Sequence, residues 1–512
     1  MSGIICPDWE RMDMQKQLTR AFSLGFALVL GWVLLNSVLR WPHNGPAALL
    51  AGLALGFVAF FAARFLLPLL DQIPLPRFRR GMAAALAVYT LILGWLGFRL
   101  AELPIMDMAT VLQSLPDFLD DGVPQVWGAY YIICNNNLGL ALVLVLWYRL
   151  VGIFGITPDT EAGIYAGIVL NVLVIAFSVA LVCLLARRIL KRNSAVALAF
   201  LLCVGFLPFV LWSPCFYSDT LCLPFALLVV LGWTRYRQEH RPGVRLALLA
   251  AMAAAAFVGY AVKGSVVVVL VAVLIQLFLE KKVRQALVAA VLLLAVFGVL
   301  LAGYRAWQRT FLDFSVQDAV GLPVELWFAY GSGGDGNYND QVCQSAKSLA
   351  TMDQRRQMLR QYIAAQYGSR SPAGQLDFMT RKAAITWGNG LYDAQEFLAT
   401  PLKVNWTHRF ILQGQPGYMP MVYYCQTYLY FVMFLVWLGT VGAIRRAAPG
   451  PLTLVRVSVF GLMLFLCLWE TKARYAFQFT PLLLLLATAA LWQMAGLGAS
   501  RPRTEQEAAL VG

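Results

Sequence analysis

Asp107 is placed where a carboxylate could act on a hydroxyl group. It follows Pro104, Ile105 and Met106, a few residues after an apolar run that ends near residue 101. Partial desolvation at a membrane surface would raise the basicity of such a carboxylate, which suits a general base. The alternative is a solvated loop acid, and the residues alone leave that alternative open.

Asp219 is a second candidate carboxylate. It lies in Tyr217-Ser218-Asp219-Thr220, on a very short segment between two apolar runs. An aspartate at the start of a helix also accepts hydrogen bonds from backbone N–H groups, so a helix cap is an equally good interpretation. The two roles are compatible, because a cap also fixes the direction of the carboxylate.

Lys263 interrupts two apolar runs, Ala253–Val262 and Val266–Leu279, with only Gly264 and Ser265 beside it. A lone cation in such a place is costly unless it is paired or functional. The lysine could extend to lipid head groups, as long basic side chains do at a membrane interface. It could also hold the phosphate of a lipid-linked substrate, where Gly264 and Ser265 allow a close approach.

Glu470 and Arg474 share a short polar turn, Trp469–Tyr475, between two apolar runs near the end of the chain. The guanidinium of arginine is a planar fork that matches phosphate oxygens. The alternative is an anchor at the membrane interface, with Trp469 and Tyr475 as interfacial aromatic residues. The sequence leaves both open.

The composition shows which kind of molecule must position these groups. The 512 residues are 60% hydrophobic and only 13% charged, whereas soluble domains are about 25% charged. A soluble fold and a secreted disulfide scaffold are therefore excluded. The nine cysteines show no paired spacing and the three histidines are scattered, so we expect neither a disulfide framework nor a zinc site.

Apolar runs define the membrane part. A bilayer-crossing helix needs about 20 mainly apolar residues. Runs of that kind predict about twelve crossings, at 21–39, 46–70, 82–101, 164–186, 195–213, 220–234, 245–262, 264–279, 285–304, 419–442, 453–469 and 476–496. A further run at 138–154 contains Arg149, and it would reverse the side of every later basic cluster if it crossed. We expect it to lie in the outer interface or to re-enter, anchored by Trp147 and Tyr148.

Basic residues set the expected orientation, because short cytoplasmic loops are rich in Lys and Arg. The short basic clusters are separated by even numbers of these crossings, and they lie at Arg11/Lys16/Arg20, Arg77/Arg79/Arg80, Arg187/Arg188/Lys191/Arg192, Arg235/Arg237/Arg241/Arg245, Lys281/Lys282/Arg284, Arg445/Arg446 and Arg501/Arg503. Both termini are then cytoplasmic. The net charge of +14 comes largely from these loops, so it does not point to nucleic acid.

The same layout predicts consecutive regions along the chain. These are a cytoplasmic segment with two crossings (1–81), a catalytic membrane module with its first outer loop at 102–163 (82–304), an extracytoplasmic cap (305–418), C-terminal crossings (419–500) and a cytoplasmic tail (501–512). All the candidate groups fall on segments expected to face outside, which places them at one surface of the membrane.

Taken in order, these features resemble the C-type membrane glycosyltransferases, in particular their bacterial branch similar to protein mannosyltransferases and aminoarabinose transferases. The resemblance covers roughly residues 82–490, and its motifs are Asp107, Asn136-Asn137-Leu138-Gly139, Tyr217-Ser218-Asp219-Thr220-Leu221, Lys263, Lys382-x4-Trp387-x2-Gly390 and Glu470-x3-Arg474-Tyr475. Each motif is short, so their order and their shared outer side carry the resemblance.

The resemblance implies an all-α polytopic fold, with a bundle of about twelve membrane helices, interfacial helices and an extracytoplasmic cap. It implies an enzyme of the plasma membrane that moves a sugar from a polyprenyl-phosphate carrier to an outer glycan, lipid or protein. Asp107 would be the base of an inverting displacement, and Asp219 a second catalytic carboxylate that orients the acceptor or a cation. The donor and its phosphate would contact Lys263, Arg474, Glu470, Asn136, Asn137 and Tyr217. The resemblance names no certain cofactor and leaves a divalent cation open.

Two other classes of protein remain as alternatives. A transporter or flippase would place ionisable residues near the middle of the bilayer and often shows inverted repeats, whereas here those residues gather at one surface and no repeat is found. A polysaccharide polymerase or ligase would use outer arginines, and the predicted cap contains Arg355, Arg356, Arg360 and Arg370.

Overall fold

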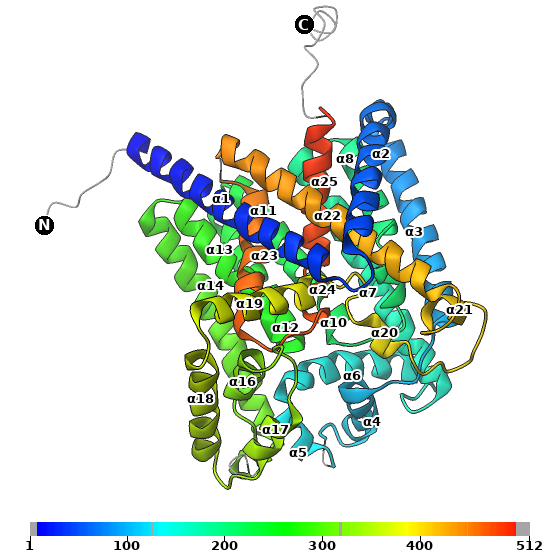
Figure 1. Ribbon diagram of the computed structural model, residues 1–512, viewed down its shortest axis with the longest axis vertical. Coiled ribbons are helices and arrows are strands. Elements are labelled where there is room, and N and C mark those ends of the chain that lie inside the picture. The colour runs from blue at the N-terminus through cyan, green and yellow to red at the C-terminus, as the bar shows by residue number, and fades with distance from the viewer. Residues whose placement is uncertain (1–7, 125, 317–319, 448, 498–512) are drawn as a thin grey trace, which may run out of the picture.

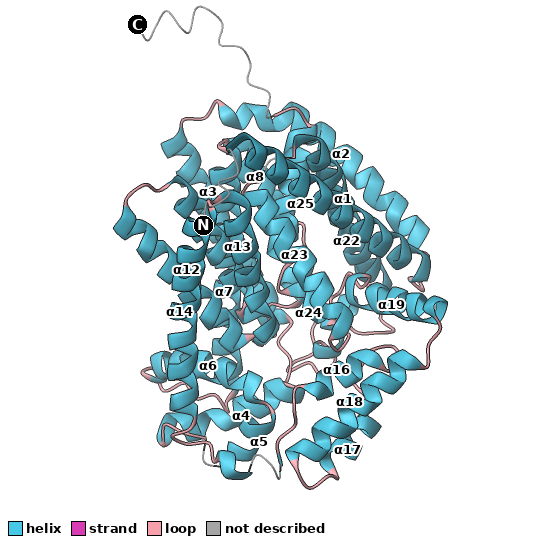
Figure 2. Cartoon of the chain, turned by 90° about the vertical axis from the view of Figure 1, so that its left-hand side faces the viewer, coloured by secondary structure: helices cyan, strands magenta, loops and turns pink. Residues whose placement is uncertain are grey.

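The structure, a computed structural model, describes residues 8–124, 126–316, 320–447 and 449–497. In these ranges the chain is helical, and the only extended pairing is an isolated bridge between Glu102 and Pro401. Figure 2 shows the long helices side by side in the upper part of the molecule and shorter helices packed below them. The predicted tail at 501–512 lies outside the described residues.

In the part of the chain that the structure describes, eight helices are long and apolar enough to cross a membrane. They are α1 (Asp8–Arg40), α2 (Gly45–Asp71), α3 (Leu75–Arg99), α7 (Glu161–Leu190), α12 (Pro242–Val262), α14 (Val283–Gln308), α22 (Tyr418–Arg446) and α23 (Pro451–Leu468). Large apolar side chains on α2, α3 and α14 are exposed, for example Phe57, Leu91 and Val299. Such wide apolar surfaces are expected where a helix faces lipid. The protein is therefore an all-α, multi-pass membrane protein.

The remaining predicted crossings correspond to shorter helices. They are α8 (Asn193–Val204), α11 (Leu223–Gln238), α13 (Val267–Glu280, preceded by the 3-10 turn η2, Gly264–Val266) and α25 (Thr480–Met494). The predicted crossing at 195–213 is the one that differs most, because α8 ends at Val204. The next residues, Gly205 to Pro208, break the helix since proline lacks the N–H that an interior turn needs.

The shortness of α8 brings a polar loop into the protein. Its 12 residues rise by only about 18 Å, which is much less than the hydrocarbon core of about 30 Å. The chain then forms α9 (Pro208–Leu211) and α10 (Ser218–Leu221) before α11 begins. The segment 211–223, which carries Asp219, is buried throughout.

The centre of the bundle is formed by α25 and α22. Every residue of α25 from Thr480 to Trp492 is buried, and α22 packs against it as well as against α1 and α2. A helix that is apolar on all sides belongs in the interior of a membrane bundle. Figure 1 shows α25 standing upright behind the oblique α22.

Several basic turns meet at the end of the bundle where α25 finishes. Asn193 donates to the backbone carbonyls of Leu70 and Ile73, and Ser194 donates to Asp71, which joins the α7–α8 turn to the α2–α3 turn. Arg446 reaches Gln493 at the end of α25. In Figure 1 this end is uppermost, and α1 also begins in the upper part of the view.

The opposite end carries the short helices of the predicted outer segments. They are α4 (Met106–Asp120), α5 (Gly128–Ile133), the 3-10 turn η1 (Asn135–Asn137), α6 (Leu138–Gly152), the 3-10 turn η3 (Phe314–Val316), α16 (Glu325–Ser332), α17 (Asp340–Lys347) and α18 (Met352–Gly368). Helices α16 to α18 share a small core of their own around Leu326, Tyr330 and Leu359. Figure 1 shows them below the membrane helices.

The apolar run at 138–154 forms α6, a helix of 15 residues that lies across the lower end of the bundle in Figure 1. This placement fits an interfacial helix. The side chains of Trp147 and Tyr148, predicted as interfacial anchors, bond to backbone carbonyls instead. The indole of Trp147 donates to the carbonyl of Ala166, and the hydroxyl of Tyr148 donates to the carbonyl of Gly163. They fix α6 to α7.

The rest of the predicted cap packs onto the bundle. Its elements are α19 (Pro372–Trp387), α20 (Ala394–Phe397) and α21 (His408–Ile411), and α24 (Arg474–Phe477) lies beside them. Helix α19 contacts α1, α23 and α24. At Gly390, which follows α19, a side chain would meet the backbone of Cys425 at 2.5 Å, so glycine is required for this contact.

Candidate active site

Asp107 lies half-buried in the first turn of α4 and accepts hydroxyl hydrogen bonds on both oxygens. Tyr130 donates to Oδ1 at 3.1 Å and Tyr217 donates to Oδ2 at 3.4 Å. Asn137 donates to the Tyr130 oxygen at 2.7 Å, and Asn136 donates to Asn137 at 3.1 Å. The predicted asparagines therefore act on Asp107 through Tyr130. Burial raises the pKa of Tyr130, so its hydroxyl keeps its proton and remains a donor.

The backbone next to Asp107 is in a rarely used conformation. Met106 has φ +52°, in the left-handed region that costs a residue with a side chain about 1–3 kcal/mol. Tyr392 and Asp393, at φ +53° and +61°, are in the same region. Strained residues are kept where the surrounding structure determines them, and they often mark functional sites. Here they fix the directions of two carboxylates.

Asp219 is fully buried in α10 and forms ion pairs with two cations. Lys263 contacts its Oδ1, and Nη1 of Arg474 lies 3.7 Å from its Oδ2. The helix-cap alternative is wrong, because Tyr217 occupies the cap position and α10 has no side-chain cap. Asp219 is instead the common partner of the two predicted phosphate ligands.

Asn171 holds the loop that carries Asp219. Its side-chain amide, buried on α7, donates to the carbonyls of Trp212, Ser213 and Cys215 at 2.8, 2.9 and 3.1 Å. These carbonyls lie in an irregular segment without helical partners, and buried backbone groups of that kind must be paired elsewhere. An asparagine within the membrane run 164–186 is the sequence signal that could have identified this role.

Lys263 and Arg474 are enclosed by aromatic rings. The Lys263 ammonium lies 4.9 Å from the centre of the Tyr475 ring. The Arg474 guanidinium lies 5.4 to 5.6 Å from the rings of Phe397, Tyr475 and Tyr217. Their side chains are only 12% and 15% exposed, so neither the head-group role for Lys263 nor the interfacial-anchor role for Arg474 is correct. The rings attract both cations through their negative faces.

Glu470 is connected through Tyr475 to the cluster formed by Asp219, Lys263 and Arg474, called the Asp219 cluster below. The Tyr475 hydroxyl donates to its Oε2 at 2.9 Å, and burial raises the pKa of the Glu470 carboxyl. The turn that bears Glu470 is held by Lys382 on α19, whose ammonium donates to the carbonyls of Cys467 and Trp469 at 2.9 Å. Burial lowers the pKa of Lys382 to about 8. Lys382 therefore positions the turn and does not face the Asp219 cluster.

Asp393 connects the cluster to a cavity. Its Oδ2 accepts the backbone N–H of Arg474 at 3.1 Å, and its Oδ1 accepts the Asn389 amide at 2.9 Å. The cavity measures about 470 Å³. Its lining comes from the end of α1, from α19 and the residues after it, from α16–α17 and from the start of α22: Ser37, Arg40, Trp41, Pro42, His43, Asp335, Arg381, Ala384, Ile385, Gly388, Asn389, Leu391, Asp393, Gln395, Tyr418 and Val422. Polar and aromatic groups thus lie together next to Arg474.

Comparison with known proteins places the chain in a family. Residues 105–495 match the sequence profile of a family described as conserved hypothetical integral membrane proteins (CHIM_prot). The chain belongs to this family. The profile covers every residue of the cluster, from Asp107 to Tyr475. No curated protein matches the chain.

A solved structure similar to this member of the CHIM_prot family is ArnT from Cupriavidus metallidurans, bound to undecaprenyl phosphate. The two chains are 13% identical, over 80% of this chain and 78% of that one. The TM-score is 0.34, which does not establish a common fold.

In this CHIM_prot protein, the predicted site residues come together from five separate segments of the chain. Tyr217 links the two carboxylates, because its hydroxyl donates to Asp107 and its ring faces Arg474, the partner of Asp219. Sequence reasoning missed Tyr130, Asn171 and Asp393. Among the described residues, no group of three His, Cys, Asp or Glu side chains could hold a metal ion.

Proposed function

We propose that the protein is a membrane glycosyltransferase that moves a sugar from a polyprenyl-phosphate-linked donor to a hydroxyl-bearing acceptor. The observation that supports this most is the assembly around Tyr217. A half-buried carboxylate with neutral partners lies on one side of this residue, and a buried pair of cations lies on the other. A displacement at a sugar phosphate needs a base for the incoming hydroxyl and positive charge for the leaving phosphate.

Asp107 is the base in this proposal. Its carboxylate takes the proton of the acceptor hydroxyl while the acceptor oxygen forms a bond to the anomeric carbon. The bond from that carbon to the phosphate oxygen breaks, and the electron pair leaves with the polyprenyl phosphate. Since attack and departure occur on opposite faces, the sugar is inverted. Tyr130 and Tyr217 orient the carboxylate.

Lys263 and Arg474 stabilise the charge that grows on the departing phosphate. Asp219 holds both cations in place, because its two oxygens pair with them from a fully buried position. Lys263 and Arg474 together carry one positive charge more than Asp219 offsets, and burial disfavours the charged form of the neighbouring Glu470. Burial strengthens this interaction, since fewer water molecules compete with it.

The donor sugar is proposed to extend toward Asp393 and its cavity, which adjoins Arg474. Trp41 and Tyr418 supply aromatic faces there, while Asn389 and Gln395 supply amide groups. Binding pockets for small molecules combine apolar walls with a few polar groups in this way. The cell membrane is the proposed location, with the cluster on the extracytoplasmic side and both termini in the cytoplasm.

The arginines that suggested a polymerase or ligase have structural partners. Arg355 is buried and donates to the carbonyls of Gly321, Ala346 and Leu349, and Arg360 pairs with Glu325. Arg370 donates to the carbonyl of Ser332 at 2.7 Å. These contacts stabilise the α16–α18 unit, so they favour the transferase over the polymerase.

The test is a transfer assay in liposomes that contain the purified full chain and short-chain polyprenyl phosphosugars, with cell-envelope lipids and glycans as acceptors. Released polyprenyl phosphate and glycosylated product are measured by mass spectrometry. Asp107→Asn should abolish both, whereas Asp120→Asn, an exposed acid on the same helix, should not. Full activity of Asp107→Asn, or solute flux without a covalent product, would refute the proposal.

A further inference from the structure

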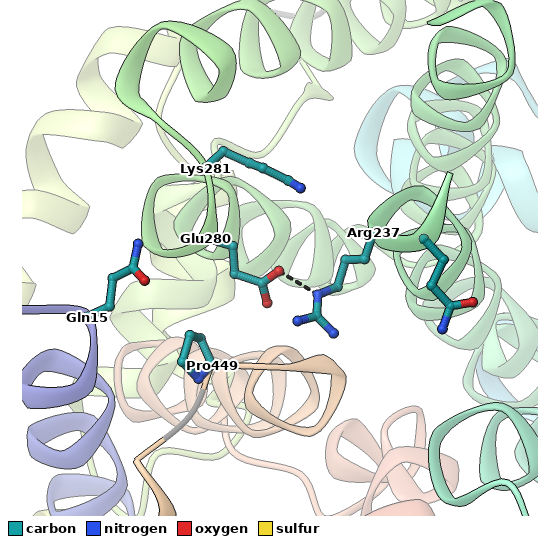
Figure 3. Close-up of a pocket in the computed structure, with 6 residues that line it drawn as sticks. Gln15, Arg237, Glu280, Lys281 and Pro449 are labelled. Atoms are coloured by element: carbon teal, nitrogen blue, oxygen red, sulfur yellow. Dashed lines mark hydrogen bonds and ion pairs between the residues drawn. The ribbon is translucent and has the colours of Figure 1, made fainter. Parts of the chain in front are cut away.

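A second cavity of about 470 Å³ lies at the other end of the bundle. It is lined by Gln15, Arg237, Gln238, Glu280, Lys281 and Pro449 (Figure 3). Helix α13 connects the two ends, because η2 begins beside Lys263 and α13 ends at Glu280. The proposed sugar transfer therefore does not use this cavity. The lining residues come from α1, α11, α13 and the turn between α22 and α23.

Glu280, the one acid among the described lining residues, already has partners on both oxygens. Oε2 of Glu280 accepts Nε of Arg237 at 2.5 Å, and Oε1 accepts the side-chain amide of Gln276 at 2.6 Å. Gln276 is fully buried, and the Glu280 side chain is 8% exposed. Both carboxylate oxygens are thus occupied: Oε2 holds the Nε edge of the Arg237 guanidinium, and Oε1 is held by Gln276.

The rest of the Arg237 fork is directed into the cavity. Figure 3 shows its two terminal nitrogens below the nitrogen that bonds Glu280, with Pro449 farther to the left. In the part of the chain that the structure describes, neither nitrogen has a hydrogen-bond partner. A fork of this kind matches two oxygens of one phosphate group.

Further positive charge surrounds this fork. Lys281 lies beside the cavity, 5.8 Å from the centre of the Tyr236 ring. Arg245 lies on the same ring at 4.7 Å and donates to its hydroxyl at 2.8 Å. Burial, followed by the neighbouring Arg245, lowers the pKa of Lys281. Arg237 is paired with Glu280, whereas Lys281 lies among like charges, so a bound anion would relieve the repulsion that Lys281 experiences.

We propose that this cavity binds a phosphate-bearing anion, held by the Arg237 fork and the Lys281 ammonium. Gln15 and Gln238 supply neutral donors on the remaining sides. The cavity is at the ends of membrane helices, where lipid head groups lie, so the phosphate can come from an acidic phospholipid or from free phosphate. A neutral or cationic ligand would leave the cations uncompensated, so neither suits the site.

The test measures binding to the purified full chain in a neutral detergent by isothermal titration calorimetry. The probes are dihexanoyl phosphatidic acid, inorganic phosphate and, as a neutral lipid, dihexanoyl phosphatidylcholine. We expect saturable binding of phosphatidic acid and none of phosphatidylcholine. Loss of one charge-assisted pair corresponds to about tenfold weaker binding or more, so Arg237→Gln should show at least that loss. Lys281→Gln should show a smaller one.

Arg284→Gln is the matched control, since Arg284 is an exposed cation at the same end and does not line the cavity. It should bind as the unchanged protein does. Saturation by inorganic phosphate as well would show that the phosphate group suffices, and saturation by the lipid alone would show that the head group and its chains are needed. Binding of neither, or equal losses in Arg284→Gln and Lys281→Gln, would overturn the proposal. Arg237→Gln leaves Glu280 without its ionic partner, so this variant could be unfolded. In that case the binding constant of Lys281→Gln tests the proposal.

Discussion

The two carboxylates that Tyr217 connects are held in opposite ways. Asp107 is half-buried and stands on the short helix α4, at the end of the bundle opposite the basic turns; among the described residues, its side chain has only hydroxyl groups as hydrogen-bond partners. Asp219 is fully buried inside the bundle and has two cations as partners. A carboxylate with hydroxyl partners can gain a proton without disrupting an ion pair. A carboxylate between two cations holds both of them in place, so its loss would leave buried positive charge without a partner.

The two carboxylates are therefore suited to two different tasks, proton exchange and the holding of positive charge, which one acidic residue could not perform alone. The Asp107 region (Asp107 with its partners Tyr130 and Tyr217) can exchange protons with a substrate, because the Asp107 carboxylate is accessible. The Asp219 region (Asp219, Lys263 and Arg474) can hold positive charge in a fixed place, because Asp219 is fully buried and pairs with both cations. Loss of Asp107 should therefore affect catalysis alone, and loss of the Asp219 pairing should affect folding as well.

The largest expected effect is on the transfer rate, and it tests whether Asp107 acts as a base. Asp107→Asn keeps the shape of the side chain and can still accept a hydrogen bond, but it cannot take a proton. General-base catalysis is worth about 10²–10⁴-fold in rate, so we expect kcat to fall by about that amount. The melting temperature should not change. Both are measured on purified protein, by transfer assay and by thermal unfolding in detergent.

Asp120→Asn on the same helix controls for a general effect of removing an acid from α4. If Asp107→Asn lowered the melting temperature as much as it lowered the rate, the two regions would not differ as described. Asp107 would then be a structural residue.

The next effect concerns the Asp219 region. Lys263→Met removes the closer cation and leaves a buried carboxylate with Arg474 as its only ionic partner. Breaking a buried ion pair costs about 3–5 kcal/mol, so we expect a loss of that order in the free energy of unfolding. Chemical denaturation in mild detergent would measure it.

The free energy of unfolding of the double variant Lys263→Met/Asp219→Asn is compared with those of the two single variants. Removing both charges should recover part of the stability, because no uncompensated charge remains in the interior. If the double variant were as unstable as the sum of the two single variants, Lys263 and Asp219 would not be coupled, and Lys263 would act by packing alone.

The sequence predicted the membrane class and most helices because these depend on long apolar runs, which any segment shows by itself. It also identified Asp107, Asp219, Lys263 and Arg474 as polar residues in costly places. Their partners were harder to predict. The Tyr217–Asp107 contact joins residues 110 positions apart, and nothing in the local pattern around either residue reports it.

The missed features have the same physical origin. Asp393 stands in an irregular segment whose strained backbone is determined by the packing around it, so no periodicity marks it. The predicted crossing at 195–213 was too long because apolar residues continue after Gly205, although the helix does not. Burial inside a membrane protein makes a broken helix as apolar as a continuous one.

Glu102 allows a test of how the Asp107 region is attached. It lies at the isolated bridge to Pro401, and its Oε1 is 3.7 Å from Nε2 of His408, with both side chains buried. Burial raises the pKa of Glu102 to about 8 and lowers that of His408. This pair is thus kept neutral, in contrast to the ion pairs of Asp219.

The direction of the pH effect follows from these shifts. Between its ordinary pKa of 4.5 and about 8, native Glu102 keeps a proton that the unfolded chain loses, so stability falls as pH rises through that range. Below pH 6.5, His408 acts in the opposite sense, because the unfolded chain binds a proton there that the native state does not. From pH 6.5 to 8 only the Glu102 effect remains, and it amounts to about 2 kcal/mol.

Thermal unfolding of the unchanged protein and of Glu102→Gln at pH 6.5 and 8 measures this effect. Glutamine stays neutral, so the variant should lose less stability than the unchanged protein between the two values. Equal losses would mean that Glu102 is ionised in the folded state and that the Asp107 region contains a buried charge after all.

The smallest expected effect concerns Tyr217, the residue that joins the two regions. Tyr217→Phe removes the 3.4 Å hydrogen bond to Asp107 and keeps the ring that faces Arg474. One such bond is worth about 1 kcal/mol, so we expect kcat to fall about fivefold, with KM for the donor unchanged. Tyr130→Phe should act similarly, because it removes the other donor to Asp107. If Tyr217→Phe instead raised KM for the donor and left kcat intact, the hydroxyl would serve the phosphate side, and Asp107 would depend on Tyr130 alone for its orientation.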